Sequence, residues 1–125
     1  MNLELAKDFC RALPGVTEDV KWECSLVFSI GGKMFAVTRV GDAADGISLK
    51  VDDGRFLELT DRPGIIPAPY LARMKWVRIV DLRKVGDAEA AALLRRAYEL
   101  VAAKLSKKAQ RELGLHGGLP AAVPR

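Results

Sequence analysis

The sequence predicts an α+β fold, a two-layer sandwich in which an antiparallel sheet carries its helices on one face. Two observations lead to this prediction. Apolar segments with the alternation of strands are joined by glycine turns, as in hairpins. The two long helical segments each have apolar residues along one side only, as helices that pack on a sheet do. The 125 residues suffice for one domain with a single core.

The N-terminal segment predicts a helix with one apolar face. Its apolar residues recur three and four positions apart, as on one side of a helix. They are Leu3, Ala6, Phe9, Cys10 and Leu13. Pro14 and Gly15 end the pattern, because proline lacks the N–H group that a helix interior needs.

Three strands are predicted next. Residues 26–30 and 33–40 flank a pair of glycines, and glycine readily adopts the positive φ of tight hairpin turns. A turn segment at 41–46 leads to a third strand at 47–51, whose alternation directs one set of side chains to the core. That set is Ile47, Leu49 and Val51. The predicted sheet therefore has one buried face and one solvated face.

The middle of the chain predicts a short helix and then a loop. Asp52 and Asp53 can cap a helix that ends near Leu59, since carboxylates accept hydrogen bonds from the free N–H groups of a first turn. Its core-facing residues would be Phe56, Leu57 and Leu59. Residues 62–70 contain three prolines, which predict a stiff, exposed loop without regular structure.

The last part of the chain predicts a strand, two helices and a tail. A fourth strand is expected at 75–82, and Asp87 starts a long helix with one apolar side. Ser106 can cap a further short helix. Residues 114–125 contain glycines and prolines and predict a flexible tail, so that the single domain spans 1–113.

The composition excludes several classes of protein. No apolar stretch reaches the ~20 residues of a membrane span, and the N-terminus lacks the regions of a signal peptide. We therefore expect a cytoplasmic protein without a membrane partner. Cys10, Cys24 and His116 cannot form a Cys/His zinc site, and any catalytic triad would depend on a histidine in the tail. We expect no metal, no cofactor and no enzymatic activity.

The net charge of +4 is unevenly distributed along the chain. Residues 1–61 have a net charge of −4, and residues 62–125 have a net charge of +8. An anionic partner would bind the second half, and nucleic acid is one such partner. Basic helices are also ordinary solvated surfaces, so the charge alone leaves both interpretations open.

Two groups of residues are candidates for nucleic-acid binding. In the first, Lys50, Trp76 and Arg78 would lie together on the helix-free face of the sheet, provided that the apolar residues between them point inward. An exposed indole between cations suits nucleic acid, because cations contact phosphates and aromatic rings stack on bases. Alternatively, Trp76 is buried and Arg78 is only solvated.

The second group follows the proline-rich loop and comprises Tyr70, Arg73 and Lys75. A stiff loop with an aromatic ring and two cations can grip a nucleic-acid backbone, since its ordering cost is partly removed in advance. Alternatively, Tyr70 packs over the edge of the core. A weaker third candidate is a basic stripe along the last helices, which a solvated helix face also explains. Its members are Arg96, Lys104, Lys107 and Arg111, if one helix continues through Ser106.

Five short motifs occur in an order and spacing that resemble the MmcQ/YjbR family. They are Leu13-Pro14-Gly15, Gly32-Lys33-Met34-Phe35-Ala36, Ser48-Leu49-Lys50, Pro67-Ala68 and Lys75-Trp76-Val77. The resemblance covers about residues 5–113 and implies a CyaY-like fold, also described as a double-wing architecture, in a family usually described as DNA-binding. Tyr70 stands where many relatives have a histidine, so the resemblance implies aromatic stacking at this position but no imidazole proton transfer.

The sequence therefore predicts a non-enzymatic protein that binds DNA weakly, or with the help of a protein partner, through the loop and the sheet face. The alternative is a small-ligand or protein-interaction module without a role in nucleic-acid binding. Salt dependence distinguishes the two, because binding through phosphates weakens steeply as ionic strength rises.

Overall fold

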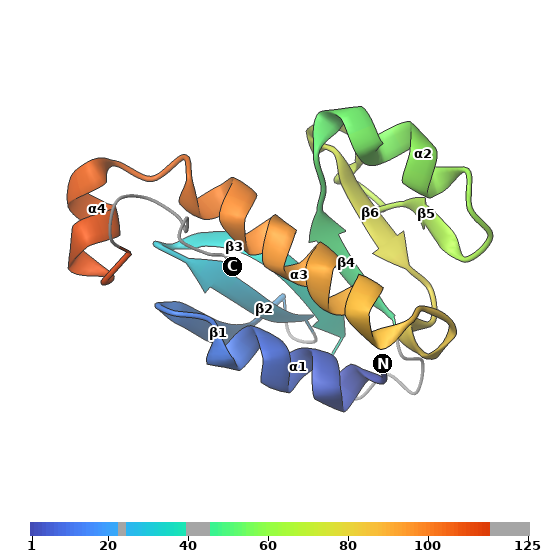
Figure 1. Ribbon diagram of the computed structural model, residues 1–125, viewed down its shortest axis with the longest axis horizontal. Coiled ribbons are helices and arrows are strands. Elements are labelled where there is room, and N and C mark those ends of the chain that lie inside the picture. The colour runs from blue at the N-terminus through green and yellow to red at the C-terminus, as the bar shows by residue number, and fades with distance from the viewer. Residues whose placement is uncertain (23–24, 40–45, 116–125) are drawn as a thin grey trace.

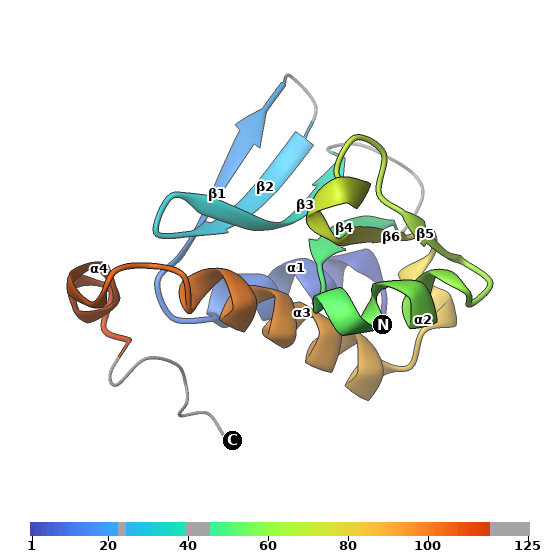
Figure 2. The same cartoon turned by 90° about the horizontal axis from the view of Figure 1, so that it is seen from above.

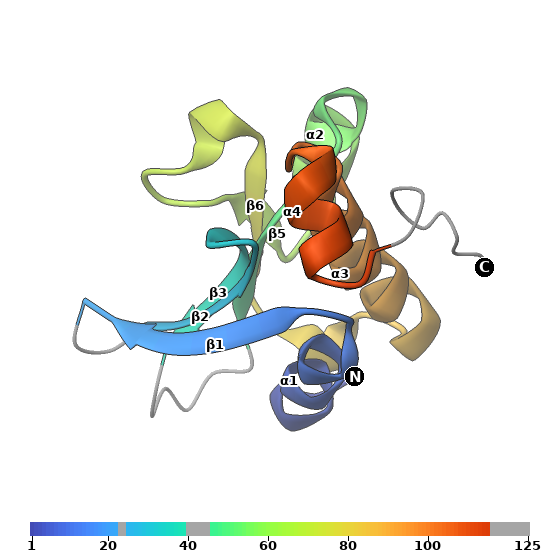
Figure 3. The same cartoon turned by 90° about the vertical axis from the view of Figure 1, so that its left-hand side faces the viewer.

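In the described parts of the chain, six antiparallel strands form one open sheet, and the α-helices lie on one side of it (Figure 1, Figure 3). The computed structural model describes residues 1–22, 25–39 and 46–115. Within these ranges the strand order is β1-β2-β3-β4-β6-β5. The α+β class, the antiparallel sheet and the placement of the helices on one face are as predicted.

The described elements alternate between strands and short helical segments. The strands are β1 (Val16–Lys21), β2 (Ser25–Ile30), β3 (Lys33–Arg39), β4 (Ile47–Lys50), β5 (Ile65–Pro67) and β6 (Trp76–Ile79). The α-helices are α1 (Leu3–Ala12), α2 (Phe56–Thr60), α3 (Asp87–Ala102) and α4 (Lys107–Glu112). The 3₁₀ segments are η1 (Asp53–Arg55), η2 (Ala72–Met74) and η3 (Leu82–Lys84).

The core lies between the sheet and the helices α1 and α3, which run side by side beneath the strands (Figure 2). Leu49 of β4 and Val77 of β6 are register partners, and both are buried in the main apolar cluster. Ala6 of α1 and Leu94 of α3 are fully buried in the same cluster. The predicted apolar faces of the first helix and of the strand at 47–51 are therefore confirmed.

The turn between α1 and β1 ties the N-terminal helix to α3. The hydroxyl of Tyr98 donates a hydrogen bond of 2.6 Å to the carbonyl oxygen of Pro14, and the Tyr98 ring packs edge-on against Phe35 with 5.7 Å between ring centroids. Gly15 has a φ of +77°, and a Cβ there would lie 2.9 Å from Cδ1 of Ile30. Only glycine fits this turn without strain.

The β2–β3 hairpin contains an irregularity that sets the two faces of β3. Gly31 and Gly32 have φ values of +61° and +81°, as a two-residue turn of the favoured kind requires. The register then shifts, so that Phe35 and Ala36 are both buried in the core although they are neighbours. A bulge of one extra residue allows this. Met34 is thereby directed to the opposite, helix-free face.

Two of the six strands were not predicted. β1 is an edge strand, and most of its residues are exposed, so its sequence lacks apolar alternation. β5 lies at the other edge and ends at Pro67, which an edge strand tolerates because its N–H group is not needed for pairing. The prediction that residues 62–70 have no regular structure is therefore wrong at Ile65–Pro67.

The short helical segment after β4 also differs from the prediction. The carboxylate of Asp52 caps no backbone N–H group and instead accepts hydrogen bonds from Arg96 of α3, with 2.9 Å between Nη2 and Oδ1. Leu59 is fully buried as predicted, whereas Leu57 is 79% exposed. The structure has α2 only five residues long, and such a helix directs few side chains inward.

The C-terminal helices are separate. The helix α3 ends at Ala102, and Ser106 caps α4 by accepting a hydrogen bond of 3.0 Å from the amide of Ala109. A continuous basic stripe across both helices is therefore wrong, and the predicted Ser106 cap is confirmed. Leu115 is buried in the core, so the folded part extends past residue 113. The predicted tail beyond residue 115 and the predicted turn at 41–45 lie outside the described residues.

Replacing Leu49 by alanine should lower the free energy of unfolding by ~2–5 kcal/mol, because the side chain is fully buried between the sheet and the helices. Chemical denaturation of both proteins measures the difference. The matched control is Leu57→Ala on the exposed side of α2, which should cost less than about 1 kcal/mol. Equal losses for the two variants would contradict the placement of the core.

The Asp52–Arg96 ion pair should make part of the free energy of unfolding depend on pH. Hydrogen bonding to Arg96 lowers the pKa of Asp52 below its ordinary value of 3.8. The pair therefore stabilises the folded protein above that pH, and the contribution is lost as the pH falls through the lowered pKa.

Asp52→Asn should lower the free energy of unfolding by at most about 1 kcal/mol near neutral pH, since both groups are partly exposed. The difference from the parent should vanish in strong acid. Asp61→Asn, at an exposed position without an ion pair to a described residue, is the control and should change the free energy of unfolding by less than about 0.5 kcal/mol near neutral pH. A difference for Asp52→Asn that persists in strong acid would contradict the electrostatic origin.

Candidate functional site

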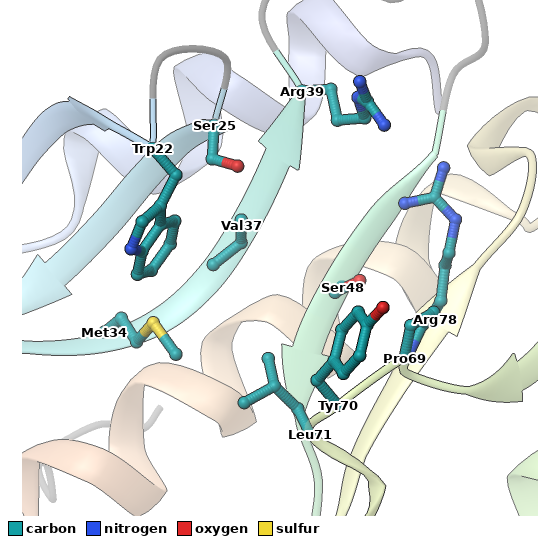
Figure 4. A pocket seen from close by; sticks show the side chains of 10 residues that line it. All are labelled: Trp22, Ser25, Met34, Val37, Arg39, Ser48, Pro69, Tyr70, Leu71 and Arg78. Atoms are coloured by element: carbon teal, nitrogen blue, oxygen red, sulfur yellow. The ribbon is translucent and has the colours of Figure 1, made fainter.

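The helix-free face of the sheet contains a groove of about 620 Å³, shown in Figure 4. We call it the sheet groove and define it by its lining residues. They are Trp22, Ser25, Met34, Val37, Arg39, Ser48, Pro69, Tyr70, Leu71 and Arg78. Its volume lies within the range of about 300–1,000 Å³ that is typical of small-molecule pockets.

Three strands form the floor of the sheet groove. Val37 of β3 is the register partner of Ser48 of β4, and Ser48 is the partner of Arg78 of β6. Their neighbours Leu49 and Val77 point into the core. Because side chains alternate along a strand, the three floor residues must point away from the helices.

Two exposed aromatic residues form opposite rims of the sheet groove (Figure 4). Trp22 follows the end of β1 and is 65% exposed, and Tyr70 lies in the loop after β5 and is fully exposed. Both have positive φ values, 51° and 66° respectively. This conformation costs an ordinary residue about 1–2 kcal/mol. Strained residues of this kind cluster at binding sites.

Residues 68–75 form a loop that is fastened to the sheet beside the groove. The amide of Trp76 donates to the carbonyl oxygen of Leu71 at 3.3 Å, and the amide of Ala68 donates to the carbonyl oxygen of Trp76 at 3.1 Å. The Trp76 side chain is only 4% exposed. It lies on the helix-free face as predicted, but it is buried there, so the expectation of an exposed indole for stacking is wrong.

Lys50 also supports this loop. Its Nζ donates a hydrogen bond of 2.6 Å to the carbonyl oxygen of Met74, and Asp53 lies 3.8 Å away. Burial lowers the pKa of Lys50, and the charge of Asp53 opposes this shift. Lys50 shares the sheet face with Arg78, as predicted, but its ammonium group is engaged within the protein. It is therefore a poor candidate for a phosphate contact.

The two cations predicted in the loop have different environments. The ammonium group of Lys75 lies 5.1 Å from the centroid of the Phe56 ring, a cation–π contact with the first residue of α2. Lys75 does not line the groove. Arg73 in η2 is exposed and forms no hydrogen bond or ion pair with a described residue. Of the six predicted residues, Tyr70 and Arg78 line the groove, and Arg73 lies in the adjoining loop.

The sequence-based reasoning missed Trp22, Met34, Arg39 and Leu71. Arg39 could have been found, since Val37 and Arg39 alternate with the buried residues of the predicted hairpin strand. Met34 could not have been found in this way, because the sheet face to which it points depends on the bulge in β3. Trp22 follows a strand whose charged sequence gave no apolar pattern.

The described residues contain no group of His, Cys, Asp and Glu that could hold a metal ion. Burial raises the pKa of the Cys10 thiol to about 12, which keeps it protonated and unreactive. Cys24 and His116 lie outside the described ranges. No helix in the part of the chain that the structure describes is long and apolar enough to cross a membrane.

These features define a one-sided α+β sandwich with a grooved, helix-free sheet face. The YjbR family model matches residues 11–100, and the chain belongs to the YjbR family. A search of curated proteins gave no match.

Solved structures of other proteins are similar to this chain, among them the following two. The crystal structure of protein DR2400 from Deinococcus radiodurans, described as a DUF419 domain, is 30% identical over 94% of both chains, with a TM-score of 0.82. A protein from Pseudomonas syringae is 24% identical over 81% of this chain and 99% of its own, with a TM-score of 0.66. The second likeness shows the fold alone.

Replacing Tyr70 by glycine should leave the free energy of unfolding unchanged or raise it by up to about 1 kcal/mol, because glycine relieves the positive φ and no packing is lost. Thermal or chemical denaturation checks this. Arg73→Gly, in the neighbouring 3₁₀ segment, is the control and should be destabilising. A loss of stability in Tyr70→Gly as large as in the control would show that Tyr70 helps to hold the loop.

Proposed function

We propose that this protein binds single-stranded nucleic acid, DNA in the first instance, in the sheet groove and without catalysing a reaction. One observation carries the proposal. The sheet groove has exposed aromatic residues on two rims and two arginines in its lining, and its described lining residues include no carboxylate. Proteins that bind single strands combine these two features, stacking surfaces and cations.

The aromatic rims supply the stacking surfaces. Trp22 and Tyr70 are well exposed and approach the groove from opposite sides (Figure 4). A base that stacks on an aromatic side chain gains ~1–3 kcal/mol, largely independent of its identity. The stacking role assigned to Trp76 from the sequence passes to Trp22, because Trp76 is buried.

The cations for phosphate contact are few and local. Arg78 is half-buried in the groove and forms no ion pair with a described carboxylate, and Arg73 lies exposed in the adjoining loop. Several other arginines of residues 62–125 form ion pairs. Arg62 bonds Glu89, and Arg96 bonds Asp52. Within residues 62–125, the part that lines the groove and its loop is therefore the region best suited to contact the phosphates of a nucleic acid.

The form of the groove favours single strands over duplexes. Stacking on Trp22 or Tyr70 needs a base with a free face, and bases inside a duplex have none. The described lining residues also contain no histidine or carboxylate that could act as a general base. This supports a binding protein rather than an enzyme.

A small-ligand module is the second candidate function. The groove volume of about 620 Å³ favours it, since such volumes are common for pockets that hold metabolites. The two functions differ in their response to salt. Each phosphate contact with a single strand adds about −0.7 to the slope of log affinity against log salt, whereas an uncharged ligand in the groove would show almost no slope.

The test is a salt titration with fluorescent oligothymidine, using anisotropy between about 50 and 200 mM salt. The single strand should bind more tightly than the matched duplex, and its affinity should fall as salt rises. Arg73→Gln should weaken binding and lower the slope by about one contact. Tyr70→Ala should weaken binding by ~1–3 kcal/mol with the slope unchanged.

Arg111→Gln is the matched control, because it removes one exposed positive charge from α4, on the helical side of the protein. It should bind like the parent. If neither strand form binds the parent protein at low salt, nucleic-acid binding is wrong and the small-ligand function takes its place.

A further inference from the structure

The sheet groove has two chemically different ends. Arg39 and Arg78 lie at one end, and Met34 and Leu71 lie at the other (Figure 4). The register agrees with this view. Val37 pairs with Ser48, so Arg39 lies opposite position 46 at the start of β4. Both arginines therefore sit where β3 ends and β4 begins.

Gly46 makes room for the cationic end. A Cβ at this position would lie 2.6 Å from Nη2 of Arg78, closer than side chains approach one another. The guanidinium group of Arg78 is thereby placed against the start of β4 rather than out in solvent. A cation with this restricted position can hold an anion at one defined place in the groove.

The described residues that line the opposite end carry no charge. Met34 and Leu71 are half-buried apolar side chains. Lys50, on the same sheet face, donates its hydrogen bond to the carbonyl oxygen of Met74 in the loop. A ligand group at this end would therefore meet apolar surface, with the rings of Trp22 and Tyr70 between it and the arginines (Figure 4).

We infer that the sheet groove binds one nucleotide unit in a single direction, with its base between Trp22 and Tyr70 and its phosphate at the guanidinium group of Arg78. The ligand class is a nucleoside phosphate, either free or within a strand. This inference rests on the proposed function, since it concerns the same groove. It adds that one nucleotide is the unit of recognition and that the phosphate sets its direction.

The size of the groove supports a single unit. A volume of about 620 Å³ is that of a pocket for one small molecule. A long basic track for many nucleotides would need a row of cations along the groove, whereas the cations in the described lining are confined to one end. Further nucleotides of a strand would extend past the groove, along the loop that carries Arg73.

The experiment uses amide NMR of the full chain with three probes: thymidine, thymidine 5′-monophosphate and oligothymidine. The monophosphate should bind at least about tenfold more tightly than thymidine, as expected for a hydrogen bond to a charged group. The added phosphate should shift the amide signals of Gly46 and Ile47, while the shifts at Leu71 should be the same for both ligands. These readouts need no variant.

Variants then test the direction in which the nucleotide binds in the groove. Arg78→Gln should bring the affinity for the monophosphate down to that for thymidine, while Arg111→Gln keeps the difference. Tyr70→Ala, at a fully exposed position that folding does not need, should weaken both ligands by the same factor.

The possible outcomes separate this inference from the proposed function. If oligothymidine binds but the monophosphate does not, the one-nucleotide unit is wrong and the proposed function stands. Failure of all three probes to bind overturns both. The proposed direction of the bound nucleotide is wrong in either of two cases. In the first, Arg78→Gln weakens the binding of thymidine and of the monophosphate equally. In the second, the added phosphate shifts the amide signal of Leu71 rather than that of Gly46.

Discussion

The packing of every described α-helix on one side of the sheet leaves the other face free of α-helices. Each strand directs one set of side chains into the core, as Leu49 and Val77 show, and must therefore direct the alternate set outward. Part of the outward set is covered by the loop of residues 68–75, beneath which Trp76 is buried. The sheet groove is the part of this face that the loop leaves open.

The sequence predicted those elements whose burial is one-sided and whose turns need glycine. The alternation around Leu49 identified the core face of β4, and the pair Gly31-Gly32 identified the β2–β3 hairpin. The edge strands β1 and β5 were not predicted, because most of their residues are exposed to solvent and exposure imposes no apolar pattern on a sequence. The bulge that reverses the face of Met34 could not be predicted from the sequence either, because a bulge depends on how one strand pairs with another.

The candidate site could be predicted only in part, for a related reason. Alternation placed Lys50, Trp76 and Arg78 on one face, and the structure has them there. Whether such residues are accessible depends on what covers them. The loop that buries Trp76 and engages Lys50 is held by contacts between segments far apart in the sequence, which alternation does not report. Arg78 is half-buried and lines the groove together with residues of this loop.

The distribution of charge argues for weak binding dominated by stacking. The net charge of +8 in residues 62–125 suggests a strong attraction for phosphates. In the structure, however, Arg62, Arg83, Arg95 and Arg96 form ion pairs with carboxylates. The cations left near the sheet groove allow few phosphate contacts, and each contributes only modestly at physiological salt. Under the proposed function, most of the affinity would therefore come from stacking on the exposed rings of Trp22 and Tyr70.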